Sequence, residues 1–372
     1  MKLLVLPREQ SSPYQRLLYT ELRRQGAAVS YLGELTPSHL LNLLLLPLEL
    51  AVRRLGGARL VHLHWVHRFV LPGGGRFPVL RGVAYGWFVL CLAAVRLLGL
   101  HLVWTVHNAL PHEPVFTDDT RARRRLARSC DLVIVHTPSA LAELAAFGAV
   151  PRASAVIPHG PLLPPVPSES LRTPGAGDGP RRFLFFGKVR EYKGVEDLLA
   201  AFAALPGGTA AHLTVAGECW DPDLRPALMA LARPLGDRVT LRLERVPDGE
   251  LTGLLADADV VVLPYRRITT SGSAMLALAH GRPLIVPDLD SLADLPDQAV
   301  LRYDRTVPGL TAALLRACGA SAGTLAAMSA AGGDFAGAVP WPRIAAMTMS
   351  ELNAVLGESQ PADQRGSALA AR

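Results

Sequence analysis

The sequence has 372 residues, of which half are hydrophobic and 19% are charged, so it can bury the cores of about two domains. Lysine and arginine exceed aspartate and glutamate by 38 − 32 = 6 charges. This modest excess argues against a dedicated nucleic-acid binder and suits an anionic ligand or a membrane surface. The four cysteines are scattered without a CxxC pair, which indicates reduced core thiols in a cytoplasmic protein.

The first half of the chain alternates short apolar runs with helical patterns. Strands are predicted at residues 2–7, 60–65, 101–108 and 131–138, and a last one ends before His159–Gly160. Because the N-terminal run soon turns polar, we interpret it as a strand and not as a signal peptide. This βαβα order predicts a parallel sheet covered by helices on both faces.

Two apolar stretches in this half raise the question of a membrane. The first, residues 39–57, carries a proline and a glutamate, and the second, residues 85–100, is interrupted by Arg96. Both fall short of the about 20 uninterrupted apolar residues that a membrane span needs. We expect core helices here. The alternative is a contact with the membrane surface, with Arg53, Arg54 and Arg96 near lipid phosphates.

The second half repeats the α/β pattern after a break. Residues 161–181 are rich in proline, glycine and serine, which is typical of a linker. Strands are then predicted at residues 182–187, 211–217, 239–244, 258–264 and 283–288. We therefore expect domains at residues 1–160 and 182–338, a separate helix at 339–356 and a disordered tail at 357–372. Two such domains predict a cleft at the carboxyl ends of their strands, where open parallel sheets bind ligands.

The strongest local signal is the segment FLFFGKVREYKGVEDLLAAF. Gly187 permits a tight turn after a strand, and Lys188 and Lys193 lie just before the next helix. The chain has only three lysines, and an arginine-rich sequence would fill a mere surface loop with arginine. The pattern therefore favours a phosphate site over a solvated basic loop.

A second polar cluster follows the strand predicted at residues 258–264. A helix is expected to start near Ser271–Gly272, with its amides pointing at phosphate and the glycine allowing close approach. The alternative is an ordinary core helix capped by a hydroxyl residue. The residues expected to contact the ligand are Tyr265, Arg266, Thr270, Ser271, Gly272 and Ser273.

These segments together resemble the GT-B fold glycosyltransferases of group 1, a large family that includes bacterial mannosyl- and glucosyltransferases. The resemblance rests on FFGKVREYKGVEDLLAAF, LERVPDGELTGLLADADVVVLPYR, AHGRPLIVPD, VHTPSALAEL and VIPHG, and covers nearly the whole ordered chain. It implies two Rossmann-like, doubly wound α/β domains that face each other across a cleft. It also implies that the helix at residues 339–356 crosses back to the N-terminal domain.

The resemblance further implies that the second domain holds a GDP- or UDP-linked sugar, with no metal and no other cofactor. Lys188 and Lys193 match the basic residues that hold the diphosphate in such enzymes. The backbone around Arg245 and Val246 matches the part that meets the nucleobase. Lysine, a compact point charge, suits a diphosphate whose negative charge grows as the sugar leaves.

The sequence departs from the family pattern at one place. Many relatives carry two glutamates that face the donor sugar and the ribose, and the matching positions here, near Ile268 and Leu276, are not acidic. The sugar hydroxyls must therefore be read differently, for instance by Thr269, Thr270 or Tyr265. The departure leaves open both the donor and whether the reaction retains or inverts the anomeric configuration.

In the first half, His107 follows a predicted strand, at a place where a histidine of such enzymes often faces the donor sugar. We expect it to accept the acceptor's proton or to bind the sugar; the alternative is a histidine satisfied within the fold. Glu113 and Asp118 are alternative bases. Zinc at His62 and His64 is disfavoured because no carboxylate or cysteine completes the shell. The acceptor side is expected to comprise His64, Trp65, Arg68, Asn108, His112 and Glu113.

The sequence thus predicts a cytoplasmic glycosyltransferase, which the alternative of a membrane contact would place on the inner face of the plasma membrane. The acceptor would be a hydroxyl of a lipid-linked or polysaccharide intermediate. A non-catalytic GT-B subunit that binds a partner glycosyltransferase or a glycan is the alternative. A nicotinamide enzyme is disfavoured because no GxGxxG follows a strand, and a phosphorylase because no lysine follows Lys193.

Overall fold

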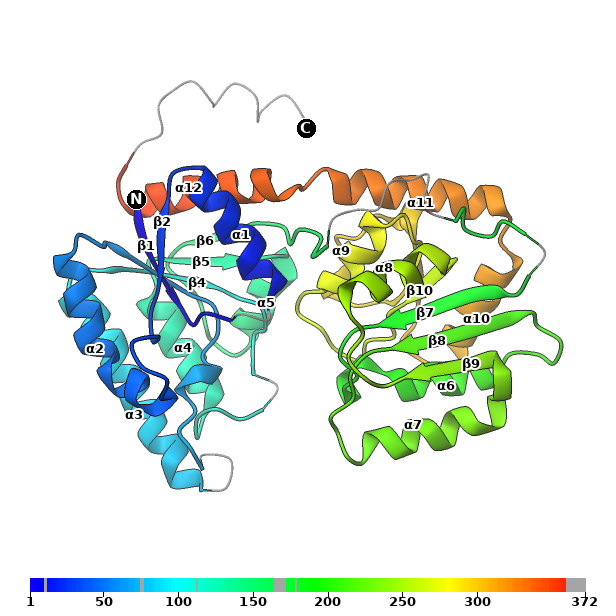
Figure 1. The fold of residues 1–372 in the computed structure, drawn as a ribbon, viewed down its shortest axis with the longest axis horizontal. Helices are drawn as coiled ribbons and strands as arrows, with labels where there is room; N and C mark the ends of the chain where they lie inside the picture. Colours follow the sequence, from blue (N-terminus) through cyan, green and yellow to red (C-terminus); the bar gives the residue numbers. More distant parts are fainter. Residues whose placement is uncertain (10–11, 74–76, 112, 164–171, 178, 359–372) are drawn as a thin grey trace. The chain divides into compact units, whose positions relative to one another are not determined.

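The computed structural model describes the chain except residues 10–11, 74–76, 112, 164–171, 178 and 359–372. It divides into two compact units, one of Met1–Pro158 with Trp341–Arg372 and one of His159–Pro340. Each unit is a parallel sheet flanked by helices (Figure 1). The tail that the sequence predicts to be disordered falls, from residue 359 onward, outside the described residues.

The first unit is built on a sheet in which all the described pairings are parallel. Its strand order is β2-β1-β3-β4-β5-β6. The strands are β1 (Lys2–Leu6), β2 (Ala28–Tyr31), β3 (Leu60–Leu63), β4 (His101–Thr105), β5 (Leu132–Val135) and β6 (Ser154–Val156). The register places Val5, His62, Val103 and Leu132 in one row across the sheet, so the carboxyl ends of the four central strands lie at one edge.

Helices cover both faces of this sheet. They are α1 (Pro13–Arg24), α2 (His39–Leu55), α3 (Pro78–Leu97), α4 (Asp119–Ser129), α5 (Pro138–Ala146) and α12 (Trp341–Val355), with the short turn η1 (His67–Phe69). One core joins the sheet to α2, α3, α4 and α5. The other face is covered by α1, which packs against α12. Three of these helices begin at a side-chain cap, namely Ser12, Ser38 and Asp118.

The second unit repeats the architecture with the strand order β12-β11-β10-β7-β8-β9, again parallel in all the described pairings. The strands are β7 (Arg181–Phe186), β8 (Ala211–Ala216), β9 (Val239–Arg242), β10 (Val260–Val262), β11 (Leu284–Pro287) and β12 (Val300–Tyr303). Phe183 and Phe185 of β7 enter one core, and Leu184 and Phe186 enter the other. This alternation is the two-residue period of a strand buried on both faces.

Helices on the two faces of the second sheet complete the two cores of this unit. The helices are α6 (Val195–Ala203), α7 (Leu224–Ala232), α8 (Asp248–Asp257), α9 (Gly272–Ala279), α10 (Val307–Gly319) and α11 (Ala322–Gly337), with the turns η3 (Glu191–Lys193), η4 (Arg233–Arg238), η5 (Asp290–Leu292) and η6 (Asp297–Ala299). Side chains of α6, α7 and α10 fill one core. Those of α8 and α9 fill the other.

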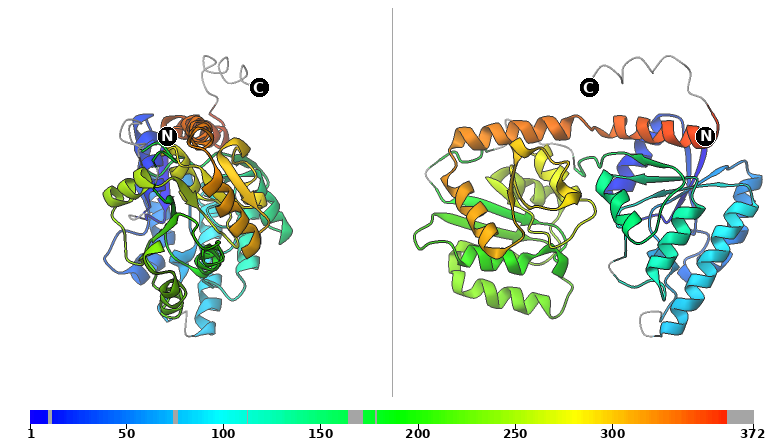
Figure 2. Two further views of the ribbon diagram at one scale, coloured as in Figure 1. Left: turned by 90° about the vertical axis from the view of Figure 1, so that its right-hand side faces the viewer. Right: turned by 180° about the vertical axis from the view of Figure 1, so that it is seen from behind.

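The predicted fold class, two Rossmann-like α/β halves, is confirmed. Each strand that the sequence predicts is present, and two strands that it does not predict, β2 and β12, are edge strands. The C-terminal helix belongs to the first unit (Figures 1 and 2). There Gln25 Nε2 donates to Pro342 O at 2.9 Å, and the Trp341 ring lies 5.3 Å from that of Tyr14.

Candidate functional site

In the second unit, two glycines bring the ends of neighbouring strands into contact. Gly187 follows β7 with φ of +116°, and Gly217 follows β8 with φ of +156°. The Gly187 amide donates to Ala216 O at 3.0 Å. A Cβ atom on Gly217 would lie only 1.9 Å from Gly187 O. Side chains are therefore excluded here, and the two strand ends approach each other backbone to backbone at the carboxyl edge of the sheet.

The loop after β7 closes onto the loop after β10. Gly194, which separates η3 from α6, has φ of +69°, and a Cβ on it would lie 2.0 Å from Pro264 O. The Arg266 amide donates to Tyr192 O at 2.9 Å. The two polar segments that the sequence singles out are thus neighbours in the fold.

Lys193 lies on an aromatic platform supplied by the second of these loops. Its Nζ is 4.1 Å from the centroid of the Tyr265 ring, at cation–π distance. Tyr265 is buried, and its hydroxyl lies 3.0 Å from Ser271 Oγ. The platform holds the Lys193 charge beside the N-terminus of α9, whereas Lys188 is exposed on the same loop.

The hydroxyl residues around the start of α9 make different contacts. Ser271 Oγ accepts from the Ala274 amide at 3.1 Å and caps the helix, as the alternative interpretation expected. Thr270 Oγ1 is buried and has no hydrogen-bond partner among the described residues. Ser273 Oγ faces Gly187, where a Cβ would lie 3.4 Å away. Thr270 and Ser273 are therefore the hydroxyls that remain suited to a ligand.

At Gly272 the atoms that come close to the backbone belong to the protein itself. A Cβ at this position would lie 2.8 Å from Leu162 Cδ1 and 3.2 Å from His159 Cε1. His159 Nδ1 lies 2.7 Å from Gly160 O, and burial lowers the pKa of this imidazole to about 4. The sequence predicted that this glycine admits phosphate; its neighbours in the structure are the uncharged His159 and Leu162.

Arg266 is held by carboxylates. Its Nε and Nη2 donate to the two oxygens of Asp197 at 2.7 and 2.9 Å, and Glu196 Oε1 lies 3.6 Å from Nη1. The hydrogen bonds to Asp197 and the nearby Glu196 and Glu191 raise the pKa of the guanidinium. We predicted a bond from Arg266 to phosphate, but in the structure its charge is balanced by α6 and η3. This pairing fastens the loop after β10 to the loop that carries Lys193.

The remaining positions that the sequence relates to the sugar donor lie after β9, just before α9 and within α9. Arg245 is exposed, and Val246 is half-buried against the core under α8 and α9. Ile268 packs against the same core, and Leu276 lies inside it. The positions at which relatives carry carboxylates are thus apolar contacts of the fold.

In the first unit, three flat rings predicted for the site stack at the carboxyl edge of the sheet. His107, after β4, lies 4.5 Å from Trp65 at an interplanar angle of 19°. It lies 5.2 Å from His64, after β3, at an angle of 20°. Asn108 follows half-buried. The structure therefore brings together His64, Trp65, His107 and Asn108.

A chain of hydrogen bonds leads from the sheet to His107. Thr105 Oγ1 lies 2.7 Å from His62 Nε2, and the Tyr19 hydroxyl lies 2.9 Å from His62 Nδ1 and 2.5 Å from His64 Nε2. His64 Nδ1 then lies 2.9 Å from His107 Nε2. Because the single proton of Tyr19 goes to one imidazole, the other imidazole must donate to the phenol oxygen. The tautomers of His64 and His107 are thereby coupled.

Burial keeps the inner part of this chain uncharged. It lowers the pKa of His62 to about 3, and it lowers that of His64, with a further contribution from His62, His107 and His136. Burial likewise raises the pKa of the Tyr19 hydroxyl. At neutral pH the chain is a set of neutral donors and acceptors, which orient His107 without adding charge.

Sequence reasoning missed the aromatic and imidazole groups around these rings. Tyr14, at the start of α1, meets His107 edge-on at 4.8 Å and His136 at 5.2 Å. His136 follows β5, and its Nδ1 lies 2.9 Å from Ile157 O. A polar residue directly after a buried strand was the available signal, since His136 stands where His64 and His107 stand on their own strands.

The remaining acceptor-side residues are dispersed. Glu113 is exposed, and Asp118 accepts from the Arg121 amide at 2.8 Å as the cap of α4. His112 lies outside the described residues. Arg68 Nη2 lies 3.8 Å from Glu9 Oε2 and also lines a separate cavity. Of the described residues among these, Arg68 and Asp118 thus have partners other than the stacked rings.

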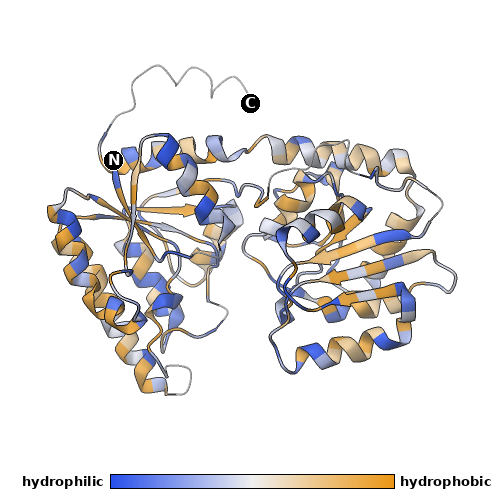
Figure 3. Cartoon of the chain, in the orientation of Figure 1, coloured by the Kyte–Doolittle hydropathy of each residue, from blue (hydrophilic) through white to orange (hydrophobic). Residues whose placement is uncertain are grey.

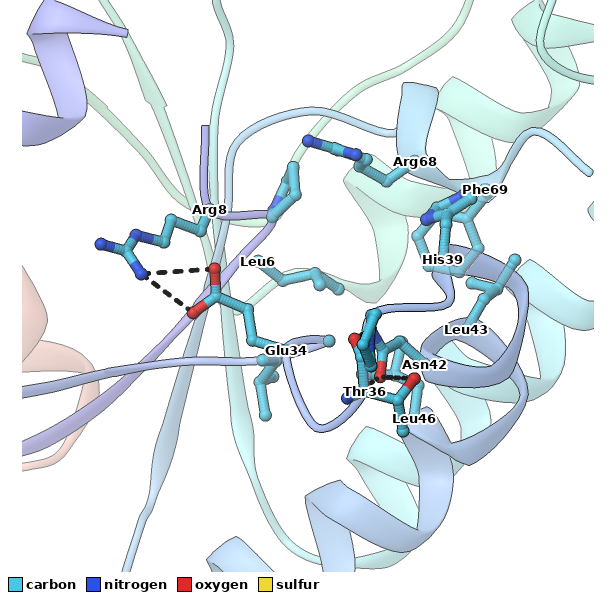
Figure 4. Close-up of a pocket in the computed structure, with 14 residues that line it drawn as sticks. Leu6, Arg8, Glu34, Thr36, His39, Asn42, Leu43, Leu46, Arg68 and Phe69 are labelled. Carbon is cyan, nitrogen blue, oxygen red and sulfur yellow. Dashed lines mark hydrogen bonds and ion pairs between the residues drawn. The ribbon is translucent and has the colours of Figure 1, made fainter. Parts of the chain in front are cut away.

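That cavity, of about 280 Å³, lies beyond the carboxyl ends of β1 and β2, beside α2 (Figure 4). Leu6, Leu43 and Leu46 form part of an apolar lining. The polar lining includes Arg8, whose Nη1 pairs with Glu34 at 3.2 Å. The cavity therefore combines apolar walls with guanidinium groups whose charge is met by Glu34 and Glu9.

Comparison with known proteins gives related glycosyltransferases. Residues 180–319 match the family described as Glycosyl transferases group 1. A GDP-mannose:glycolipid 4-beta-D-mannosyltransferase of Xanthomonas campestris pv. campestris is 29% identical over 240 residues. That alignment covers 64% of this chain and 64% of the relative, so the chain spans just under two thirds of the relative's length.

Solved structures share the architecture over nearly the whole chain. Sucrose-phosphate synthase from Thermosynechococcus elongatus superimposes with a TM-score of 0.74 at 19% identity, covering 96% of this chain and 99% of that one. The Anabaena protein HepE in complex with UDP gives a TM-score of 0.71 at 14% identity, covering 95% and 100%. Family match and fold agree for the second unit: residues 180–319 match the group 1 glycosyltransferases, and the chain has the GT-B fold.

Proposed function

We propose that this protein transfers a sugar from a nucleoside diphosphate sugar to a hydroxyl group of a glycan or glycolipid acceptor. In this reaction the bond between the anomeric carbon and the diphosphate oxygen breaks. A new bond forms between that carbon and the acceptor oxygen, whose proton passes to a base. The nucleoside diphosphate leaves with the bonding electron pair, so negative charge grows on its phosphate oxygens.

One observation carries the proposal: Lys193 lies on the Tyr265 ring beside the N-terminus of α9. The ring fixes the ammonium group in place before any ligand arrives, which reduces the reorganisation needed when charge develops. The amides of α9 and the unpartnered Thr270 hydroxyl add donors of the kind that a phosphate oxygen accepts. Lys188, exposed on the same loop, supplies a second positive charge.

For the donor we propose a GDP-linked sugar, with a UDP-linked sugar as the other possibility. The Xanthomonas relative is named for GDP-mannose, and the HepE structure holds UDP. The backbone around Arg245 and Val246 would meet the base, because it follows β9 at the same sheet edge as Gly187. The sugar hydroxyls would be read without the two glutamates of the relatives, since Ile268 and Leu276 are core contacts.

For the acceptor we propose a glycolipid, held by the first unit. The same Xanthomonas relative is named for a glycolipid acceptor. His107 would take the proton of the acceptor hydroxyl or bind the sugar, with its tautomer set by the chain through His64 and Tyr19. Trp65, stacked on His107, offers a flat apolar face of the kind on which sugar rings pack.

The test is the variant Lys193→Ala. Hydrogen bonds to a charged group contribute about 1.5–3 kcal/mol, so affinity for GDP or UDP should fall about 10- to 100-fold in titration calorimetry. Sugar transfer should fall at least as much, because the diphosphate charge is greatest in the transition state. Lys2→Ala removes the same charge from the first unit, where Lys2 Nζ donates to Gly56 O at 2.7 Å, and serves as the control.

Wild-type nucleotide affinity in Lys193→Ala would contradict the proposed donor site. Activity with EDTA present tests independently whether the two lysines suffice without a divalent cation. Because Ile268 and Leu276 are apolar, a second function is also open: a subunit that binds a nucleotide sugar or a glycan without transferring the sugar. That possibility predicts nucleotide binding without hydrolysis or transfer across a panel of GDP-, UDP- and ADP-sugars.

A further inference from the structure

The helix α2 presents leucine and valine to solvent along one side. These residues are spaced by three or four positions, so they form a continuous stripe, and Leu48 and Leu55 are 62% and 89% exposed. The stripe consists of Leu41, Leu44, Leu48, Val52 and Leu55. The opposite side of the helix, including Leu43, Leu46 and Leu50, is buried in the core. The helix is therefore apolar on both sides, which core packing alone does not require.

The neighbouring helix α3 repeats this pattern. Its exposed stripe runs through Val79, Val83, Gly86, Leu90, Ala93 and Leu97. Its buried side includes Ala84, Phe88, Cys91 and Val95. Leu97 is 88% exposed. By contrast, the exposed large hydrophobics of the second unit are scattered: Trp220, Met229, Leu231 and Leu315.

The two stripes form one surface. Both helices pack into the same core and against each other, and Trp87 Nε1 donates to Leu43 O at 3.0 Å. Because each stripe lies opposite the buried side of its own helix, both point away from the same face of the sheet. Figure 3 shows hydrophobic residues along the length of both helices. We call the exposed residues of the two stripes the α2–α3 apolar surface.

The charged side chains of these helices that are not buried are all arginines. Their only carboxylate is Glu49, which is buried, accepts from the Gly33 amide at 2.9 Å and pairs with Arg53 at 3.3 Å. Arginines stand near the ends of the helices, with Arg54 and Arg96 at the C-terminal ends. Arg54 Nε donates to Leu98 O at 3.0 Å, so these two ends lie side by side. An apolar surface bordered by arginine is complementary to an anionic lipid bilayer.

We propose that the α2–α3 apolar surface docks this protein on an anionic membrane, with both helices lying in the plane of the interface. A second copy of the chain fits less well, because a two-fold contact would bring the same arginine-bordered surface onto itself without an exposed carboxylate to meet it. The docking surface is independent of the proposed donor site, which belongs to the second unit.

The helix α3 is long and apolar enough to cross a bilayer. Among the described residues it is the single unbroken helix with this length and composition. Its packing argues instead for surface docking. Phe88, Cys91 and Val95 are buried in the core of the first unit, beside strand β4 that follows. Crossing the membrane would remove these side chains from that core, whereas docking covers only the outward stripe.

The experiment measures binding of the purified full chain to vesicles. Vesicles of phosphatidylglycerol mixed with phosphatidylcholine should co-sediment the protein at low salt, and pure phosphatidylcholine should retain it less. High salt should weaken the binding, because it screens the arginine–lipid attraction. Leu48→Asp and Leu90→Asp, both on the outward stripes, should each lower the partition coefficient about tenfold or more, since each removes the burial of a leucine in lipid.

Met229→Asp, which alters an exposed apolar residue of the second unit, is the matched control and should bind vesicles as the wild type does. Nucleotide affinity should be unchanged in all three variants, which keeps this test separate from that of the donor site. Failure to co-sediment at low salt would overturn the proposal. So would wild-type vesicle binding by both leucine variants, or a wild-type dimer in sedimentation velocity that Leu48→Asp converts to monomer.

Discussion

The two units have the same architecture and different chemistry at the same place. At the carboxyl edge of the first sheet, the residues after the strands are His64, His107 and His136, in contact with Tyr14. At the carboxyl edge of the second sheet, glycine turns and Lys193 stand beside a helix N-terminus. The first edge is a largely buried set of aromatic and imidazole rings, and the second is a glycine-rich site with positive charge.

Under the proposed function, this difference would assign the donor diphosphate to the second unit and the acceptor hydroxyl to the first. A diphosphate needs fixed positive charge and close backbone approach, which glycine and lysine provide. An acceptor hydroxyl needs a neutral base of defined tautomer, which a buried imidazole chain provides. The second edge should therefore respond more to the loss of backbone space or charge. The first should respond more to pH, because burial lowers the pKa of both His62 and His64 there and of His159 alone at the second edge.

The largest effect is expected from Gly194→Ala, which disturbs the second edge alone. The new Cβ would lie 2.0 Å from Pro264 O, and the residue would keep φ of +69°. Strain of the left-handed conformation and displacement of a backbone contact together should lower the free energy of unfolding by about 3 kcal/mol. Urea unfolding measures this, and nucleotide affinity should fall as well, because the loop that carries Lys193 must move.

Gly208→Ala is the matched control. Gly208 also has a positive φ, of +85°, but its Cβ would have no atom within 4 Å. It should therefore lose only about 1 kcal/mol, the cost of the left-handed conformation. Equal losses in the two variants would show that the Gly194–Pro264 contact is unimportant for the second edge.

The sheets were predictable because buried parallel strands read as continuous apolar runs. The two strands that escaped prediction lie at sheet edges: β2 is half-exposed over most of its length, and β12 over its middle residues Leu301 and Arg302. Their sequences, AVSY and VLRY, interrupt the apolar run because one side meets solvent. Edge position, which depends on the whole topology, weakened the local signal of these two strands, although the other edge strands, β6 and β9, were predicted.

The meeting of the Lys193 loop with the loop after β10 was predictable from two rules. A glycine turn after a strand indicates a ligand loop, and parallel strands end at one edge of the sheet. The partners of individual side chains were not predictable. Nothing near Arg266 in the sequence indicates Asp197, and nothing near Gly272 indicates Leu162, because both contacts join segments far apart in the chain.

The first edge should be the more sensitive to acid. Burial holds the pKa of His62 at about 3, well below the usual value of about 6.5 in an unfolded chain. Between these two values the unfolded state binds the proton and the folded state does not, so stability falls as the pH is lowered below about 6.5. At 1.36 kcal/mol per unit, His62 alone should cost about 2 kcal/mol of unfolding free energy at about pH 5.

The measurement is urea unfolding of the wild type and of His62→Asn at neutral and acidic pH. The variant should be less stable at neutral pH, because it loses the bonds to Tyr19 and Thr105, but its loss on acidification should be smaller by about 2 kcal/mol. His39→Asn, at the exposed start of α2, should keep the wild-type pH dependence. Identical slopes for His62→Asn and the wild type would mean that the buried chain is not a neutral one.

The smallest effect should come from the charge pair Arg266–Asp197, which fastens the two loops of the second edge to each other. Arg266 and Asp197 form a two-point contact, yet both side chains are 37% exposed, so solvent screens the attraction. A double-mutant cycle with Arg266→Gln and Asp197→Asn should give a coupling of at most about 1 kcal/mol in urea unfolding. The pair Arg182–Asp257, a single contact of 3.9 Å with more exposed side chains, should give a coupling near zero.

Because the Arg266 charge is already balanced by carboxylates, Arg266→Gln should weaken nucleotide binding less than Lys193→Ala does. A larger loss in Arg266→Gln would show that the guanidinium leaves Asp197 to meet the phosphate, and the charge of the second edge would then be shared by arginine and lysine.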